Sequence, residues 1–235
     1  ANDLDNARVW FDHVKLPKSS LLNKYADIVD NNYVQTTSER MRIEVIGQRL
    51  MTGRMAIAQA ALMYAQTLHL KTQQYADSKV CNGLAGETSL ASMPQLRAVF
   101  TESEQQLSRM ASFAAEVEHR LNAHLRAGSI PEPSLVEQIA VCKIRCIDVA
   151  LQRCHALRLE VGSYALMHNT GFELMDMLLT CKFAEGDSRI LQQKLARDRL
   201  RALQKGGLGA MARAVLTAEG RAALRLARQL APAGR

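Results

Sequence analysis

The spacing of apolar residues constrains the fold most, because three long stretches of the chain follow a helical period. In each stretch, apolar side chains recur at intervals of three, four or seven residues, which places them on one face of an α-helix. The residues of the three faces are Leu50, Ile57, Ala61, Tyr64 and Leu68, then Leu107, Met110, Ala114, Val117 and Leu121, then Leu135, Ile139, Cys142, Cys146 and Val149. The segments NGLAGETS (82–89) and AGSIPEPS (127–134) separate the stretches and carry glycine and proline, which interrupt helices. Long helices joined by short breaks predict an antiparallel bundle.

The rest of the composition agrees with an all-α class. Aromatic residues make up 5% of the chain and prolines number five, whereas the helix formers Ala, Leu, Arg and Gln are abundant. We expect the first long helix to run from about Glu39 towards Tyr75. A shorter helix is expected around Gly171, another from Ser188 to KGGLG (205–209), and an Ala- and Arg-rich helix over 210–231. The predicted fold is an up-down bundle of about four helices with a helical extension.

The first residues follow another pattern. In ARVWFDHVKLP (7–17) apolar and polar residues partly alternate and the run stops at proline, which predicts one or two strands within residues 1–17. Residues 18–38 are polar and are predicted to form a linker, with Ser38 as the cap of the first helix. Two strands are not stable alone, so we expect 1–17 to be the end of a β-domain that lies outside this sequence, followed by the bundle over 39–205 and the extension over 206–235.

Charge and cysteine content exclude several classes of function. The net charge of +7 is moderate, and arginines spread around helices without interleaved aromatics do not predict nucleic-acid binding. The chain has no apolar run of the ~18 residues that a membrane span needs. The five cysteines lack the C-x-x-C spacing of zinc sites, so no metal site is predicted and buried reduced thiols are expected.

A carboxylate, a glycine and a second carboxylate stand just before a predicted helix, in FAEGDS (183–188). Asp187 and Ser188 suffice to cap that helix, so Glu185 has no required capping role. As a simple alternative, Glu185 is a turn residue whose charge favours the helix N-terminus.

The order of these segments resembles the C-terminal half of the acyl-CoA dehydrogenase and oxidase superfamily. FDHVKLPKSSLLNKYADI (11–28), TGRMAIAQAAL (52–62) and FAEGD (183–187) follow one another as in that family, and the likeness runs from about Asp5 to Arg201. The resemblance implies an N-terminal helical domain, a middle β-domain and a C-terminal four-helix bundle, with FAD between the β-domain and the bundle.

The resemblance also implies roles for individual residues. Glu185 matches the family's catalytic base, which removes the α-proton of an acyl-CoA thioester, and Gly186 lets the backbone approach the substrate. Asp187 matches a position that contacts the flavin, in addition to its predicted capping role. Arg54 matches an arginine near the acyl-CoA site, although an arginine in an apolar helix also commonly reaches to solvent.

Two flavin motifs of the family are altered here. YADSKVCNG (75–83) carries Lys79 where the family has an arginine that reaches the flavin pyrophosphate across a dimer interface. Lysine neutralises a phosphate but lacks the bidentate fork of arginine. LEVGSYA (159–165) keeps only Gly162 of a glycine-rich flavin motif, so Lys79 and Gly162 are the predicted flavin contacts together with Asp187.

Several alternatives stay open at this point. The EGD triplet and the long polar segment LLNKYADIVDNNYV (21–34) resemble oxidases, whereas the compact bundle resembles dehydrogenases that pass electrons to an electron-transfer flavoprotein. The altered flavin motifs are also compatible with a catalytically silent structural relative. The resemblance implies acyl-CoA as substrate, the N-terminal half or a companion chain as partner, and a homodimer or dimer of dimers. The oxidase resemblance implies the peroxisome, and the mitochondrion is the alternative.

Overall fold

The computed structural model describes residues 7–23, 26–35, 42–84 and 86–206, together with residues 216 and 221. The chain forms two compact units, Ala1–Leu50 and Met51–Arg235. The secondary-structure elements in chain order are a 3₁₀ turn Lys18–Ser20, β1 Ala26–Val29, β2 Asn32–Gln35, α1 Arg42–Ser78, β3 Val80–Gly83, β4 Gly86–Ser89, a 3₁₀ turn Leu90–Ser92, α2 Pro94–Ala127, α3 Pro133–Glu160, 3₁₀ turns Gly162–Leu166 and Phe172–Leu174, α4 Met175–Thr180 and α5 Ser188–Lys205.

The first unit contains a β-hairpin where the sequence predicted a linker. Strands β1 and β2 pair antiparallel, with Ala26 opposite Gln35 and Val29 opposite Asn32. Asp30 and Asn31 form the turn with φ of 48° and 61°, the left-handed values that a two-residue hairpin turn favours.

Residues 7–17 form no strand within this chain, and the prediction that 1–17 ends a β-domain stays a prediction, because the expected partner strands lie outside this sequence. An extended segment without a partner cannot complete a hydrogen-bonded ladder, whereas the Asp30–Asn31 turn supplies a partner strand locally. Residues 1–6 and the predicted cap Ser38 lie outside the described residues.

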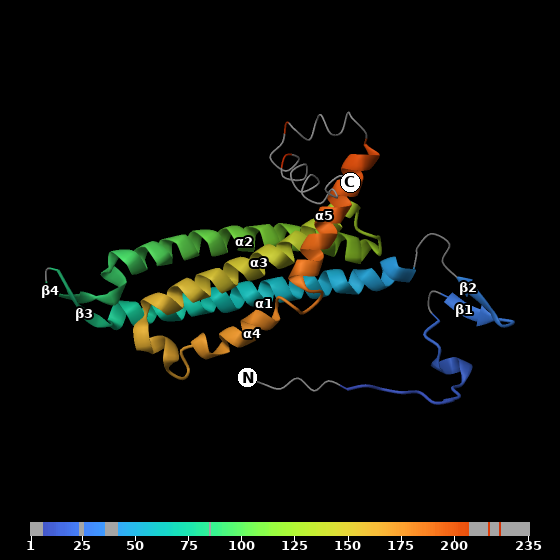
Figure 1. Ribbon diagram of the computed structural model, residues 1–235, viewed down its shortest axis with the longest axis horizontal. Helices are drawn as coiled ribbons and strands as arrows, with labels where there is room; N and C mark the ends of the chain where they lie inside the picture. Colours follow the sequence, from blue (N-terminus) through green and yellow to red (C-terminus); the bar gives the residue numbers. More distant parts are fainter. Residues whose placement is uncertain are drawn as a thin grey trace, which may run out of the picture. The chain divides into compact units, whose positions relative to one another are not determined.

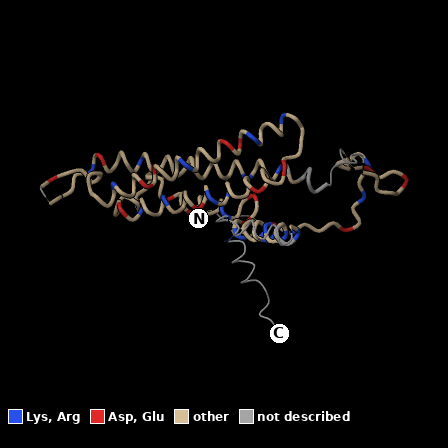
Figure 2. The backbone as a smooth tube through the Cα atoms, turned by 90° about the horizontal axis from the view of Figure 1, so that it is seen from above, with Lys and Arg blue, Asp and Glu red and all other residues tan. Residues whose placement is uncertain are grey.

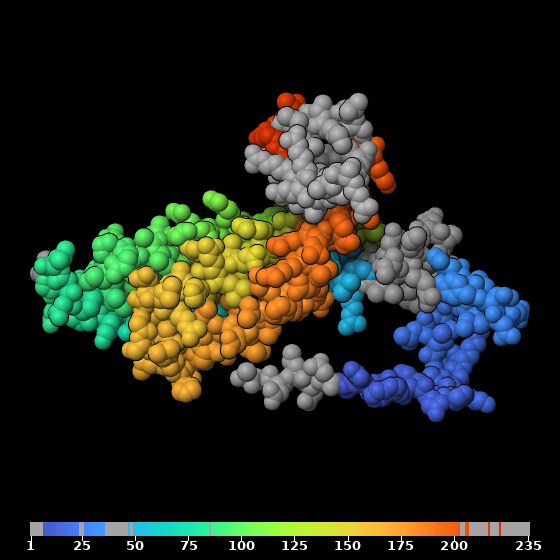
Figure 3. Space-filling model, in the orientation of Figure 1, coloured from blue at the N-terminus to red at the C-terminus, as the bar shows by residue number. Residues whose placement is uncertain are grey.

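The second unit is the predicted helical bundle. Helices α1, α2 and α3 run lengthwise beside one another, and α4 follows the underside of the layer in the view of Figure 1. Helix α5 crosses this layer at a steep angle, and its orange atoms lie directly against the yellow atoms of α3 in Figure 3. The all-α four-helix fold is therefore confirmed.

The core follows the predicted helical faces closely. All five predicted residues of α3 are buried, and four of the five predicted residues of α2 are buried, with Met110 partly buried. On α1, Ala61 and Leu68 are buried and Ile57 and Tyr64 are partly buried. Leu50 is 43% exposed, so its predicted core position is wrong. It is the last residue of the first unit.

The helix boundaries follow from the predicted breaks. Proline occupies the first turn of α2 and of α3, where its missing N–H is not needed, and Gly128 ends α2 in the left-handed conformation with φ 62°. The first break also folds into the hairpin of β3 and β4. Helix α5 ends at Lys205, as predicted. The helix predicted over 210–231 lies outside the described residues except at positions 216 and 221.

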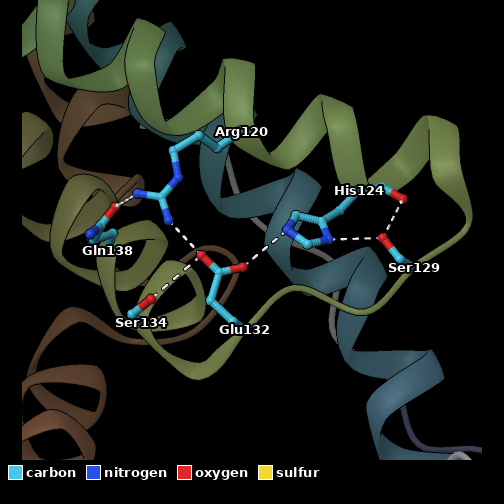
Figure 4. A network of polar contacts seen from close by, with 6 residues as sticks. All are labelled: Arg120, His124, Ser129, Glu132, Ser134 and Gln138. Atoms are coloured by element: carbon cyan, nitrogen blue, oxygen red, sulfur yellow. Dashed lines mark hydrogen bonds and ion pairs between the residues drawn. The ribbon is translucent and has the colours of Figure 1, made fainter.

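Polar contacts join the end of α2 to the start of α3. Glu132 lies at the centre of this network and accepts hydrogen bonds from Arg120 and from His124 Nε2, the latter at 3.0 Å (Figure 4). Arg120 also donates to Gln138 at 2.6 Å, and His124 Nδ1 lies 2.8 Å from Ser129 Oγ. The network fixes the angle at which the chain turns from α2 into α3.

The remaining features concern charge, cysteine and membranes. Figure 2 shows acidic and basic residues interspersed along the long helices. All five cysteines are free, and Cys142, Cys146 and Cys154 are buried as expected. No helix within the described ranges is both long and apolar enough to cross a bilayer.

Candidate active site

Residues 181–188 form a compact turn between α4 and α5, and this turn lies beside the first half of α1 (Figure 1). The N–H groups of Phe183 and Ala184 bond to the carbonyl of Thr180, at 3.0 and 3.1 Å. The N–H of Ser188 then closes the turn on the carbonyl of Lys182 at 2.9 Å. Between these bonds the backbone reverses its direction.

Glu185 and Gly186 carry the reversal, with φ of 55° and 100°. The left-handed region costs roughly 1–2 kcal/mol for a residue with a Cβ, and glycine adopts it freely. A strained backbone at a partly exposed glutamate is the type of feature that clusters at functional sites.

The carboxylate of Glu185 lies against the backbone of α1 at Gly53. A Cβ added to Gly53 would lie 2.3 Å from both Cδ and Oε2 of Glu185 and 2.7 Å from Oε1. Such distances are far below van der Waals contact, so only glycine at position 53 admits the carboxylate there. Gly53 was not predicted as a site residue. A glycine inside an otherwise well-formed helix is the signal that could have identified it.

Arg54 joins the same site from the next position of α1. Its Nε donates to the carbonyl of Glu185 at 3.2 Å, and a Cβ added to Gly186 would lie 3.7 Å from Arg54 Nη2. Burial lowers the pKa of the Arg54 guanidinium, and the charge of Glu185 opposes this shift. The structure thus brings together Arg54, Glu185 and Gly186, which the sequence placed in one substrate site.

Asp187 caps α5, as its position predicted. Its Oδ1 accepts hydrogen bonds from the N–H groups of Arg189 at 2.8 Å and Ile190 at 3.2 Å. The side chain is thereby held within the same turn as Glu185. Its predicted flavin contact stays a prediction.

Lys143 of α3 is a second residue that sequence reasoning missed. Its side chain has 0% exposure, and its Nζ donates to the carbonyls of Lys182 and Gly186 and to Ser188 Oγ. The signal lay in the spacing, since Ile139 and Ile147 are four residues to either side and both are buried. A lysine on that face must be buried as well.

Lys79 and Gly162 lie at the opposite end of the bundle from Glu185. Lys79 follows the last turn of α1, where its N–H bonds to the carbonyl of Tyr75. The ring of Tyr75 stacks on Tyr164, two residues beyond Gly162, with ring centroids 3.7 Å apart. Lys79 is exposed, and a Cβ added to Gly162 would have open space around it. The structure therefore separates the predicted site residues into two groups.

Two shallow grooves lie between α1 and α2, away from Glu185, and the first of them extends to Asp77 and Ser89 near Lys79. Their volumes are about 480 Å³ and 440 Å³, and both are lined by His69 and Glu104. His69 packs edge-on against Phe100, and burial lowers the pKa of its imidazole, with Glu104 opposing. Its Nδ1 has no hydrogen-bond partner within the part of the chain that the structure describes. Neither groove includes Glu185.

Comparisons with curated proteins and with solved structures both support the predicted resemblance. No family model matches the chain. Two curated Arabidopsis thaliana proteins, "Putative acyl-coenzyme A oxidase 3.2, peroxisomal" and "Acyl-coenzyme A oxidase 3, peroxisomal", are each 36% identical to it over 67 residues, which is 28% of this chain and 10% of theirs.

Solved structures share the fold over most of the chain. An acyl-CoA oxidase from tomato has a TM-score of 0.62 at 20% identity, covering 85% of this chain and 31% of its own. An acyl-CoA dehydrogenase from Geobacillus kaustophilus has a TM-score of 0.56 at 15% identity, covering 72% and 41% respectively. The chain thus spans well under half the length of these relatives. It has the helical-bundle fold of the acyl-CoA dehydrogenase and oxidase superfamily, and its predicted resemblance to that superfamily is confirmed.

Proposed function

We propose that this chain is the C-terminal part of an FAD-dependent enzyme that oxidises acyl-CoA thioesters to α,β-unsaturated products, of the acyl-CoA oxidase type. The observation that carries the proposal is the placement of Glu185. Its carboxylate projects from a strained turn onto the glycine of a neighbouring helix, and an arginine holds its carbonyl. A helix-capping carboxylate needs none of these features, since Asp187 already caps α5.

The chemistry assigned to Glu185 is proton abstraction. The α-proton of a thioester is weakly acidic, so its removal needs a positioned base and donors for the developing enolate oxygen. The Glu185 carboxylate takes this proton as the electron pair of the Cα–H bond forms the double bond. The backbone N–H of Glu185 is the donor that we assign to the thioester oxygen. A bound flavin supplies the acceptor for the hydride that leaves Cβ.

Two features of the chain fit a flavin. Gly162 is exposed in the left-handed conformation, with open space where a Cβ would be, so a planar ring system or a phosphate can approach its backbone closely. Lys79, at the same end of the bundle, provides an exposed positive charge for a phosphate. We assign both residues to flavin binding, and Arg54 and Gly186 to the acyl-CoA side of the site.

The oxidase assignment follows the names of the two curated relatives, which also favour the peroxisome. The solved structures include dehydrogenases, so transfer of electrons to a flavoprotein acceptor is the alternative. The two activities differ in a simple assay. An oxidase produces hydrogen peroxide from acyl-CoA and oxygen, whereas a dehydrogenase turns over only when an electron acceptor is supplied.

A catalytically silent structural relative is the second candidate function. The observation that favours it is the departure from the flavin motifs, with lysine at position 79 and Ser163 and Ala165 in place of glycines. Flavin absorbance of the chain, purified together with the preceding domains that the proposal requires, separates the candidates. If the purified protein contains no bound flavin, the proposal of an enzyme is contradicted.

The substitution Glu185→Gln tests the assigned base. Glutamine keeps the size of the side chain but accepts no proton, so flavin reduction by acyl-CoA is expected to fall roughly 10²–10⁴-fold. Flavin content and melting temperature should stay close to those of the wild type. Glu137→Gln is the matched control, because Glu137 is a partly exposed carboxylate of α3 that pairs with Arg199 instead. Wild-type rates in Glu185→Gln would remove the main reason for proposing an enzyme.

A further inference from the structure

The fully buried ammonium group of Lys143 lies directly behind the turn that carries Glu185. It donates to the carbonyl of Lys182 at 2.9 Å, to the carbonyl of Gly186 at 2.8 Å and to Ser188 Oγ at 3.0 Å. A lysine ammonium has three N–H donors. All three are used, and all three acceptors belong to the turn.

The three acceptors bracket Glu185 in the sequence. Lys182 precedes it by three residues, Gly186 follows it directly, and Ser188 is the first residue of α5. The carbonyl of Lys182 also accepts the N–H of Ser188. Lys143 therefore ties both ends of the segment that holds Glu185 to one point on α3.

A buried charge is an expensive way to fix a turn. Burial lowers the pKa of Lys143, Asp187 opposes this shift, and the nearby Arg54 adds to it. An apolar side chain of similar volume would avoid the desolvation cost, but it could not bond to three acceptors arranged around one atom. The buried ammonium therefore fixes the geometry of the turn, although its desolvation makes the core less stable.

The strained backbone at Glu185 explains why the turn needs these three hydrogen bonds from Lys143, which together act as a clamp. The φ of 55° at Glu185 is unfavourable for glutamate, so an unrestrained turn would relax and withdraw the carboxylate from Gly53. We propose that Lys143 is a positioning residue, which holds the turn over residues 182–188 in the strained conformation and thereby keeps the Glu185 carboxylate against α1. The inference rests on the proposed function of Glu185 as a base.

The test compares Lys143→Met with the wild type and with the control Lys194→Met, in the chain joined to its preceding domains. Methionine is unbranched like lysine and only one heavy atom shorter, but it donates no hydrogen bond. Lys194 is an exposed lysine of α5 that pairs with Asp198, so its loss removes the same charge without touching the turn. Three quantities are measured: hydrogen exchange of the amides in 181–191, the flavin reduction rate at saturating acyl-CoA, and KM.

In Lys143→Met, we expect faster exchange at the Ser188 amide and a rate of flavin reduction lower by about 10- to 100-fold, the cost of a misplaced catalytic group. KM should change less than the rate, because Arg54 on α1 keeps its place even though the turn that carries Glu185 and Gly186 shifts. The Lys194→Met control should match the wild type in all three. A purely structural role would lower the melting temperature without this selective loss of rate.

Three outcomes would overturn the inference. They are unchanged exchange and rate in Lys143→Met, faster exchange with a wild-type rate, and equal losses in Lys194→Met. If Lys143→Met fails to fold, Ser188→Ala removes one acceptor and should give the same changes in smaller degree; wild-type behaviour of that variant also contradicts the clamp. If the wild type reduces no flavin, the proposed function fails separately, and the exchange comparison still decides whether Lys143 holds the turn.

Discussion

Glu185 reaches its position only because residue 53 is glycine. Any larger residue would place its Cβ within 2.3 Å of the carboxylate. Glycine inside a helix costs up to about 1 kcal/mol relative to alanine, so stability alone would favour replacing it. The residue is therefore expected to serve the site at the expense of the helix.

The substitution Gly53→Ala should separate stability from activity. The carboxylate is the far end of a flexible side chain and can move aside, so the helix should gain stability or lose none. With the carboxylate displaced, acyl-CoA should then reduce the flavin about 10- to 100-fold more slowly. Gly47→Ala is the matched control, because it lies in the same helix and its added Cβ has nothing within 4 Å. Thermal melting and flavin reduction, measured for both variants, check the prediction; equal activities would contradict it.

At the scale of elements, the corner between α2 and α3 depends on the charge of Glu132. Its own backbone N–H, followed by Arg120 and His124, holds the pKa of the Glu132 carboxyl below its usual value. A carboxyl whose pKa is lower in the folded state stabilises the fold above its unfolded pKa. That contribution is lost as pH falls through the folded pKa.

The variant Glu132→Gln should therefore be less stable than the wild type at pH 7, and the difference should shrink as the pH falls below about 4.5, through the lowered pKa of Glu132. Urea midpoints measured between pH 3 and pH 7 check this expectation. Glu116→Gln, at an exposed position of α2, provides the control. A difference that stays constant with pH would show that the carboxylate charge does not stabilise the corner.

The elements also show what the sequence could and could not predict. The long helices were predictable because burial on one face repeats every three to four residues, as the buried faces of α2 and α3 confirm. The hairpin over 26–35 was missed because its signal was a short Asp30–Asn31 turn within a polar segment. The spacing of Ile139 and Ile147 signalled the burial of Lys143, but its role was missed for a different reason. Its partners lie about 40 residues further along the chain, so its role depends on tertiary packing that no local pattern contains.

At the scale of the whole bundle, the two groups of predicted site residues are too far apart to contact one flavin. At about 1.5 Å per residue, the stretch of α1 from Arg54 to Ser78 is roughly 36 Å long, which exceeds the length of an extended flavin dinucleotide. Glu185 lies at the Arg54 end, and Lys79 lies beyond Ser78. If both groups contact flavin, they contact the flavins of two different sites. A symmetric dimer provides two such sites from one kind of chain.

A mixing experiment tests this arrangement, because each site would combine Glu185 of one chain with Lys79 of its partner. Lys79→Ala should bind flavin poorly, whereas Glu185→Gln should bind flavin but not reduce it. In a mixed dimer of the two variants, one site unites the intact Glu185 with the intact Lys79, and the other site carries both defects. Random reassociation should therefore restore roughly a quarter of the wild-type activity, although each variant alone is nearly inactive. Lys71→Ala, at an exposed position on α1, should retain flavin and serves as the control. Light scattering should give the mass of a dimer or a dimer of dimers. A monomer that retains its flavin, or a mixture with no recovered activity, would contradict the shared site.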